Sequence, residues 1–423
     1  MEESNLLRVN LDCKMKIFEY LGYRDLISIA ETCKQLHAVA SDVFKRKFGK
    51  GKLALCPEHL DESSRPWIKS FEDEAPNMRP DTRLVILKLL RHFGHLVSHI
   101  FLNYEKHIAI LPYSFRHHLE DYVAKYCSKT LSNLTLIVRP KVLFDDNAVP
   151  FTNVKSLEMC ESSSLSIAKV PFTECFPNLH SLTWNAGSYN GLKARSIKVG
   201  FPSVKHMIVS KGRCNEDCNS CASIIKLWEL NPQLIELELH HDPDKCRIKL
   251  FPCIRDFLPN LQIFKVAVYE WPISGETIHF DSVVEFKLHL FRYCVIIPFT
   301  FARLKSFCVT YYTKEAQSNV SDFIAKNEHL KTLHVYYTKD SSRLTEMVSV
   351  LSIRIEELTI TDYVMLRSEV VLRLLTEIRS LKKLVLVARR YNPSSFNSQV
   401  RAKIVNEEKC GELFYVTLHP WNR

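Results

Sequence analysis

The stretch that decides the fold is QLIELEL, residues 233–239. Its first apolar residue, Leu234, is followed by Leu237 and Leu239, three and five places later. Side chains alternate between the two faces of a strand, so Leu237 and Leu239 share one face and their polar neighbours share the other. The stretch therefore predicts a short strand with one buried face and one open face.

The same pattern returns along the chain, for example in NLHSLTW at 178–184, NLQIFKV at 260–266, HLKTLHV at 329–335 and SLKKLVL at 380–386. The repeat units begin at Val97, Leu131, Val154, Leu179, Val204, Leu234, Leu261, Val283, Leu304, Leu330, Ile355, Leu381 and Leu413. The first and last starts are 316 residues apart over 12 intervals, a mean of roughly 26. This regular spacing predicts a solenoid, in which each unit buries its apolar face against its neighbours.

We expect an α/β fold: short parallel strands on the concave side of the solenoid, and irregular helices and turns outside. The pattern predicts outer helices at Phe115–Ser128, Cys221–Glu229, Leu344–Leu351 and Ser368–Ile378, and only a turn at 171–178. These units resemble the leucine-rich repeats of F-box/leucine-rich-repeat receptors. They depart from that family at the eighth position after each start, where its Asn or Cys is replaced by residues such as Glu105, Ser162, Gly187, Asp242 and Tyr269.

Three short helices are expected before the repeats. An apolar stripe from Leu11 to Leu21 predicts the first, and further apolar residues at helical spacing predict one from Arg24 to Ala40 and a short one from Val43 to Phe48. Three helices of this size bury too little apolar surface to be secure alone. Some of that surface is therefore expected to pack on something else.

Residues 10–48, NLDCKMKIFEYLGYRDLISIAETCKQLHAVASDVFKRKF, resemble an F-box, the motif that binds the Skp-type adaptor of cullin–RING ubiquitin ligases. They depart from it at Asp12, where the family usually has Pro. Asn10 or Asp12 could cap the start of the first helix. An Asp at this point sets the entry of the helix by capping it, as the Pro does in the family. The resemblance implies adaptor binding by Leu11, Ile17, Phe18, Leu21, Asp25, Leu26, Ile29, Cys33 and Phe44. The alternative is that these helices only cap the end of the solenoid.

The expected organisation has three parts. Residues 4–48 form the F-box-like three-helix domain that binds the adaptor, and residues 49–81 form a connector rich in Pro and acidic residues. Residues 82–423 form a degenerate leucine-rich-repeat solenoid with a C-terminal cap. The resemblance implies a substrate-recognition subunit of a cullin–RING ubiquitin ligase, whose repeats bind a target protein for ubiquitination. The alternative is a protein-binding scaffold independent of ubiquitin transfer.

The alternation predicts which side chains the concave face presents to a target. They are His206, Glu236, Glu238, His240, Lys265, Glu285, Lys287, His289, His334 and Tyr336. A rigid face that mixes charges and aromatic edges suits recognition of a protein segment, although a solvated strand face is polar in any case. We expect no catalytic residues, because an open sheet offers no water-excluding pocket in which pKa values shift.

The composition also predicts which kinds of partner, location and metal site the chain lacks. The net charge of +10 comes from dispersed basic residues, so we expect no nucleic acid partner. We expect no membrane span, no secretory signal and no cofactor, and a cytoplasmic or nuclear location with the 14 Cys reduced. No metal site is expected, but zinc at Cys214, Cys218 and Cys221, with a fourth ligand from Cys246 or His241, stays open.

Overall fold

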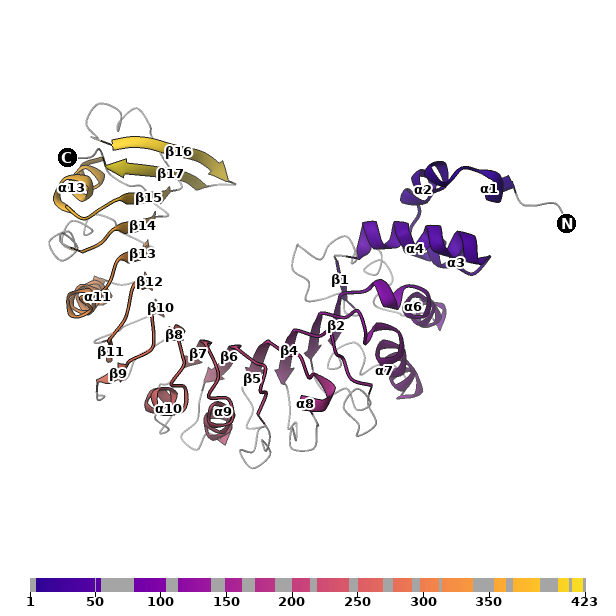
Figure 1. Ribbon diagram of the computed structural model, residues 1–423, viewed down its shortest axis with the longest axis horizontal. Coiled ribbons are helices and arrows are strands. Elements are labelled where there is room, and N and C mark those ends of the chain that lie inside the picture. Colours follow the sequence, from indigo (N-terminus) through magenta and orange to yellow (C-terminus); the bar gives the residue numbers. More distant parts are fainter. Residues whose placement is uncertain are drawn as a thin grey trace. The chain divides into compact units, whose positions relative to one another are not determined.

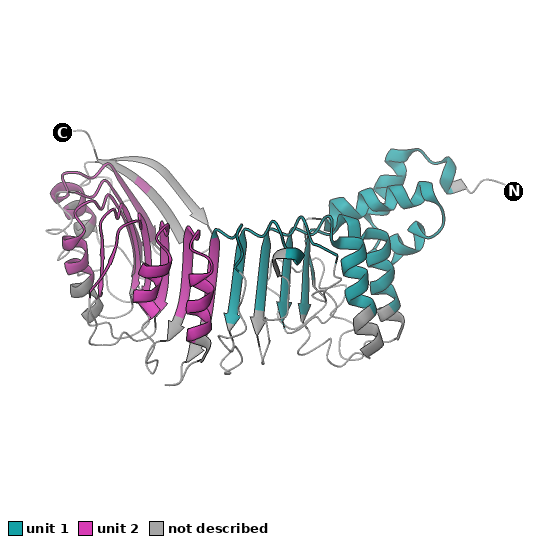
Figure 2. Cartoon of the chain, turned by 60° about the horizontal axis from the view of Figure 1, so that its bottom comes forward, with its two compact units in different colours: residues 1–205 teal, residues 206–423 magenta. Residues whose placement is uncertain are grey.

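The structure is a computed structural model. It describes residues 5–49, 51–54, 80–103, 113–137, 149–161, 172–186, 200–213, 219–242, 250–268, 277–290, 297–311, 314–337, 354–362, 368–388, 402–410 and 413–420. The chain divides into two compact units, residues 1–205 and residues 206–423. Figure 1 labels the helices and strands, and Figure 2 colours the two units.

Unit 1 combines the N-terminal helices with a parallel sheet. Its helices are α1 (Asn5–Arg8), α2 (Leu11–Glu19), α3 (Tyr23–Ala30), α4 (Lys34–Phe48), α6 (Pro80–Phe93), α7 (Tyr113–Cys127) and α8 (Phe172–Cys175), with a 3-10 turn at Gly94–Leu96. Its strands, in spatial order, are β1 (Lys52–Ala54), β2 (His99–Asn103), β3 (Asn133–Ile137), β4 (Ser156–Glu161) and β5 (Ser181–Ala186). β1 falls within the predicted connector, which therefore contributes a strand beside β2.

Unit 2 is a longer sheet with helices along one of its faces (Figure 1). The helices are α9 (Asn219–Glu229), α10 (Leu250–Phe257), α11 (Lys314–Lys326) and α13 (Ser368–Glu377). The main sheet follows the order β6 (His206–Arg213), β7 (Glu236–Asp242), β8 (Ile263–Val268), β10 (Glu285–Leu290), β12 (Ser306–Tyr311), β13 (Thr332–Tyr337), β14 (Glu357–Asp362), β15 (Lys383–Ala388), β17 (Leu413–Pro420) and β16 (Ala402–Cys410). All neighbours up to β15 are parallel.

The strands begin where the repeat predicts them. From β2 to β15, every strand of the main sheets starts two residues after a unit start, as β13 does after Leu330. The residue three places after each unit start pairs with its counterpart in the next unit, as Phe286 does with Phe264 and with Phe307. These side chains are fully buried, and each stabilises the fold by roughly 1.5–3 kcal/mol. The alternation therefore sets both the register and the core.

The last unit does not follow the repeat. β17, which starts at Leu413, runs antiparallel to β15 and also pairs antiparallel with β16. A hairpin, rather than another parallel unit, thus comes after the last parallel strand. The pattern of apolar spacing could not distinguish the two, because alternation is the same in either strand direction.

Two intervals are too short for a helical return. Leu261 and Val283 are 22 residues apart, and Val283 and Leu304 are 21 apart. In the described residues of these intervals the chain forms the short parallel strands β9 (Ile278–Phe280) and β11 (Phe299–Phe301). Their phenylalanines pack on those of the main sheet; the Phe280 and Phe264 ring centroids are 5.5 Å apart, and those of Phe299 and Phe286 are 5.6 Å apart.

Hydrogen bonds close the turns that lead into the strands. The backbone N–H at a unit start donates to the carbonyl three residues earlier, as Leu234 does to Asn231 at 3.2 Å. Two buried asparagines cap preceding helices: Asn231 Nδ2 donates to the Leu227 carbonyl at 2.6 Å, and Asn327 Nδ2 donates to the Phe323 carbonyl at 2.7 Å. These hydrogen bonds satisfy the polar groups of the turns before the strands.

The predicted outer helices have mixed outcomes. α7, α9 and α13 confirm three of them, while residues 344–351 lie outside the described residues. α8 is the single turn expected within 171–178, and α6, α10 and α11 were not predicted. Among the helices in the described part of the chain, none combines the length and the apolar character that a membrane crossing requires.

The N-terminal helices are divided differently from the prediction. One helix from Arg24 to Ala40 was wrong: α3 ends at Ala30, and α4 starts only after Cys33, whose φ of −160° and ψ of 162° are extended. The Thr32 hydroxyl donates to the Ile29 carbonyl at 2.7 Å and helps to close this break. No Gly or Pro marks it in the sequence, and α4 then runs without a break through the predicted third helix to Phe48.

Candidate interaction surfaces

One face of α2 is apolar and exposed. Ile17 is 47% exposed, and Tyr20, which caps the helix, is 90% exposed. With the exposed Cys13, they stand at i, i+4 and i+7, which places them on one side of the helix. Leu11, at the start of α2, is 61% exposed. It lies on the opposite side of the helix, in line with the buried Met15 and Phe18. We call Cys13, Ile17 and Tyr20 the α2 face.

The nine residues nominated for adaptor binding fall into two groups. Ile17 belongs to the α2 face, Leu11 and Asp25 are exposed elsewhere, and Leu21, Ile29 and Cys33 are partly exposed. The other three, Phe18, Leu26 and Phe44, are no more than 1% exposed and pack in the core. These three have no surface to offer a partner in this structure, because they hold the helices together.

Tyr20 is not among the residues that the sequence nominated for adaptor binding. It is nevertheless the most exposed large apolar side chain of the described residues. Its position three residues after Ile17, on the side of the helix away from Phe18, is the signal that would have found it. The resemblance to an F-box nominates only positions that match the family pattern, and position 20 is not one of them. Exposure, which the pattern does not contain, identifies the residue.

Polar contacts fix the ends of α2. The Asn10 side chain accepts the Cys13 N–H at 3.1 Å, which caps the first turn. At the other end, Lys47 Nζ donates to the Glu19 and Leu21 carbonyls, each at 2.8 Å. The last carbonyls of a helix lack partners within it and carry partial negative charge, so a lysine stabilises them. α4 therefore holds α2 in place by Lys47 as well as by apolar packing.

Known proteins support part of this picture. The F-box domain family matches residues 6–48, the segment that contains α2, α3 and α4. These residues are thus an F-box domain. No curated protein matches the chain, and the family match ends before the repeats. Beyond residue 48 the chain is a mixed α/β arrangement built around long parallel sheets.

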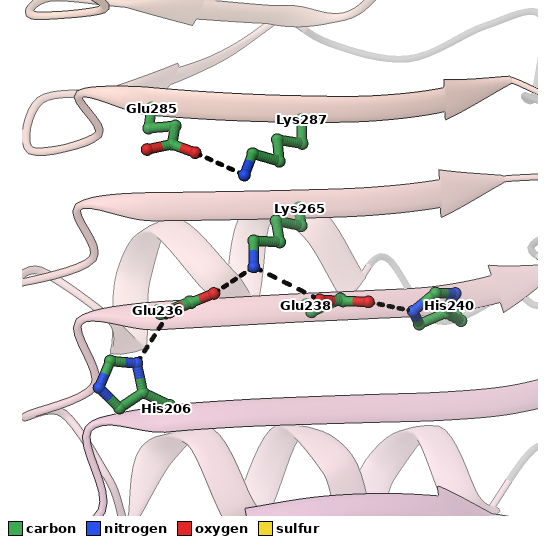
Figure 3. A network of polar contacts seen from close by, with 7 residues as sticks. All are labelled: His206, Glu236, Glu238, His240, Lys265, Glu285 and Lys287. Carbon is green, nitrogen blue, oxygen red and sulfur yellow. Dashed lines mark hydrogen bonds and ion pairs between the residues drawn. The ribbon is translucent and has the colours of Figure 1, made fainter. Parts of the chain in front are cut away.

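A second candidate surface lies on the open face of unit 2, opposite the helices. All ten side chains predicted for the concave face belong to β6, β7, β8, β10 and β13, at positions that alternate with buried residues. Figure 3 shows seven of them: five interact across β6, β7 and β8, and Glu285 and Lys287 form a separate pair on β10. We call these seven the polar network.

Two carboxylates organise the polar network. Glu236 accepts from His206 Nδ1 at 2.8 Å, and Glu238 accepts from His240 Nε2 at 2.6 Å. Lys265 lies between the carboxylates, in contact with Glu236 and 3.6 Å from Glu238. Beyond this cluster, Lys287 pairs with Glu285 at 2.8 Å. The network is therefore built by strands far apart in sequence but adjacent in the sheet (Figure 3).

The network keeps its carboxylates charged. Burial raises the pKa of Glu236, but hydrogen bonds from Lys265 and His206 outweigh it and the net pKa is lowered. For Glu238 the hydrogen bond from His240 is the largest influence, and its pKa is also lowered. The hydrogen bond to Glu285 raises the pKa of Lys287. The two carboxylates and this lysine are thus ionised near neutral pH.

The other nominated residues form a less charged region. Burial lowers the pKa of His289 and of His334, so both imidazoles are neutral near pH 7. The rings of His334 and Tyr336 stack with 4.3 Å between centroids. These side chains offer hydrogen bonds and ring faces rather than charge. The open face therefore changes from paired charges at β7 and β8 to neutral aromatic groups at β13.

The described residues add little to the zinc hypothesis. Cys214, Cys218 and Cys246 lie outside them, and Cys221 is fully buried in α9. Among the described residues, no group of three or more His, Cys, Asp or Glu is placed to hold a metal ion. A buried position within an apolar helix face suits a core residue better than a metal ligand.

Proposed function

We propose that the chain is a non-enzymatic substrate receptor of a cullin-type ubiquitin ligase. Its F-box domain binds a Skp-type adaptor, and its repeats, which we assign to the leucine-rich-repeat class, hold a target protein. The receptor supplies proximity, which turns the encounter between the ligase and the target into an effectively intramolecular step. The chain itself makes and breaks no bonds.

The observation that carries the proposal is the α2 face. A helix within residues that match an F-box domain leaves Ile17 and Tyr20 exposed, at 47% and 90%. Exposed apolar side chains that stand together favour an interface, because covering them removes apolar surface from water. The α2 face is the part of the F-box domain that we expect the adaptor to cover.

The polar network supports the second half of the proposal. A receptor requires a surface for its target that is separate from its adaptor surface. The open face of unit 2 offers charged, neutral and aromatic groups on a rigid sheet, a combination suited to recognition of a protein segment. We assign target binding to this face.

Copurification with a Skp-type adaptor tests the adaptor half. The test variant is Ile17→Asp with Tyr20→Asp, and the matched control is Leu84→Asp with Val149→Asp, which alters two exposed apolar residues (56% and 47%) outside the F-box domain. Phe18→Ala is unsuitable, because it removes a buried ring and weakens the fold itself.

The outcomes separate the receptor from its main rival, a scaffold whose N-terminal helices only cap the repeats. The receptor predicts that the adaptor copurifies with the wild type and the control but not with the test variant, all three giving the same circular dichroism spectrum. Failure of the wild type to retain any adaptor would support the scaffold.

A further inference from the structure

Basic residues gather at the turns that lead into four strands of unit 2. A turn segment here means the five residues centred on a unit start. In the segments before β12, β13, β14 and β15, the described residues include seven Lys or Arg and only three carboxylates, an excess of four positive charges. The basic residues are Arg303, Lys305, Lys331, Arg354, Arg379, Lys382 and Lys383, and we call them the basic rim.

The charge is local to these turns. The corresponding segments before β7, β8 and β10 are 232–236, 259–263 and 281–285, and they contain no Lys or Arg but three carboxylates. The net charge of +10 for the whole chain therefore does not explain the basic rim. A change of sign along a row of equivalent positions creates a directional field at the surface.

Backbone hydrogen bonds bring the basic turns side by side. The Lys331 N–H donates to the Lys305 carbonyl at 2.9 Å, and the Lys382 N–H donates to the Glu356 carbonyl at 2.7 Å. Neighbouring strands are about 4.8 Å apart, so Lys305 and Lys331 start from adjacent positions. Like charges at adjacent positions destabilise a sheet unless an anion lies between or above them.

The basic rim is open to solvent. The side chains of Lys331, Lys382 and Arg354 are 60%, 72% and 44% exposed. Arg303 and Lys305 are also exposed, and within the part of the chain that the structure describes neither forms an ion pair. A partner could therefore reach these two cations without breaking an existing pair.

The chain already contains one example of what the basic rim binds. Glu356 occupies the same turn position between Lys331 and Lys382, and its carboxylate accepts from them at 2.8 Å and 2.6 Å. The hydrogen bonds from both lysines lower the pKa of Glu356 to about 2. Two lysines of flanking units thus bind one carboxylate. Lys305 occupies the same position in the unit next to Lys331, and in the described part of the chain it forms no ion pair.

We propose that the basic rim binds an acidic segment of the target protein, which crosses the turns before β12 to β15 and places carboxylates over Arg303, Lys305 and Lys331. The inference rests on the proposed function and deepens it, since it names the chemical class of the target segment. Exposed charges of this kind steer encounter and give specificity. The polar network, whose charges are internally paired, then contacts the rest of the target.

The test measures binding of a fluorescein-labelled oligoglutamate peptide to the full chain by anisotropy. Lys305→Glu with Lys331→Glu should weaken binding by roughly tenfold or more, which corresponds to about 1.4 kcal/mol. The matched control, Lys129→Glu with Lys155→Glu, makes the same charge change at exposed lysines near the turns of unit 1 and should change binding less than roughly twofold. Binding should also fall as salt is raised, because salt screens exposed charges.

If both double variants weaken peptide binding equally, the proposal is overturned, because the net charge of the chain alone would then attract the peptide. Tighter binding of a single-stranded RNA of equal charge would also overturn it, in favour of a nucleic acid surface. Adaptor copurification is measured on the same variants. If Lys305→Glu/Lys331→Glu retains the adaptor and binds the peptide as the wild type does, the role of the basic rim is wrong but the receptor function stands. If the wild type itself does not bind the adaptor, the receptor function is wrong.

Discussion

The ring of Phe44 in α4 stacks on the ring of Phe93 in α6, with 4.4 Å between centroids and 14° between planes. Both rings are fully buried. Phe44 belongs to the F-box domain, whereas Phe93 lies outside it, just before the first repeat unit. The core of the F-box domain therefore continues into the helix that precedes the repeats, and three small helices gain the packing that they could not supply alone.

Removal of the Phe93 ring should destabilise unit 1. Phe93→Ala deletes a fully buried aromatic side chain and leaves a cavity against Phe44, so we expect a loss of about 3–5 kcal/mol. Urea unfolding followed by tryptophan fluorescence and circular dichroism measures the change. Leu84→Ala, on the same helix but 56% exposed, is the control and should cost less than about 1 kcal/mol. Equal losses for the two variants would contradict the continuous core.

The stability of unit 1 should depend on pH through the titration of His99. Burial, assisted by Lys52 on the neighbouring strand, lowers the pKa of His99 from 6.5 to about 4. The folded state therefore disfavours the protonated ring, while the unfolded chain takes up the proton near 6.5. The contribution of the neutral His99 ring to the free energy of unfolding is therefore complete above pH 6.5 and is lost as the pH falls toward 4. The His99 ring also lies 3.4 Å from the Thr135 hydroxyl, which tolerates a neutral imidazole.

Nuclear magnetic resonance titration of the His99 ring measures this directly, with an expected midpoint near 4. His99→Gln should flatten the dependence of the urea midpoint on pH between 6.5 and 4. A midpoint near the ordinary value of 6.5 would mean that the ring is solvated, and the assignment of His99 to a half-buried position beside Lys52 would be wrong.

The buried asparagines at the turns should matter more than the exposed ones. Asn327→Ala leaves the Phe323 carbonyl without the side-chain hydrogen bond that it accepts at 2.7 Å, so we expect a loss of about 1–3 kcal/mol. The control is Asn260→Ala, whose exposed side chain donates to the Pro232 carbonyl at 3.2 Å. That change should cost less than about 1 kcal/mol. Urea unfolding of both variants measures the difference, and equal costs would contradict a capping role specific to Asn327.

The polar network should no longer stabilise the folded chain in acid. The pKa values of Glu236 and Glu238 are lowered in the folded chain, so their stabilising contribution is present above 4.5 and disappears as the pH falls through their folded pKa values. Glu238→Gln should therefore reduce the loss of stability below pH 4.5. Glu229→Gln, which removes a surface carboxylate paired with Lys226, is the control and should leave the acid profile closer to the wild type. Identical profiles for both variants would contradict the role of the network.

Much of the sheet could be predicted from the sequence, because apolar alternation dictates which residues are buried and where each strand starts. The returns could be predicted less well, since a run of apolar residues such as those in Leu250–Phe257 lacks the length that marks a helix. The break before Cys33 carries no Gly or Pro signal and depends on tertiary packing. The reversal at β17 does carry a signal, because Gly411 and Glu412 separate β16 from β17, and a Gly-X pair between two strands is typical of a hairpin. β9 and β11 lie in the two shortest intervals between unit starts, and the mean spacing does not show how short these intervals are.

The candidate surfaces were predicted in part. Alternation placed all ten open-face residues on the correct side of their strands, because that face follows from period two alone. It could not predict that Lys265 contacts two carboxylates, since those contacts depend on strand register. On α2, matching to a family pattern did not separate core residues such as Phe18 from exposed ones such as Tyr20. Their roles as partner contacts remain predictions.

The central claim is that one chain joins a ligase to a target through two separate surfaces. The most direct measurement captures the proteins bound to the chain in cells and compares their abundance with the wild type and with Ile17→Asp/Tyr20→Asp. The account predicts that the same proteins are captured in both cases, and that they become more abundant when the α2 face is altered, because binding then no longer leads to ubiquitination. Captured proteins whose abundance and ubiquitination are the same with both chains would contradict it.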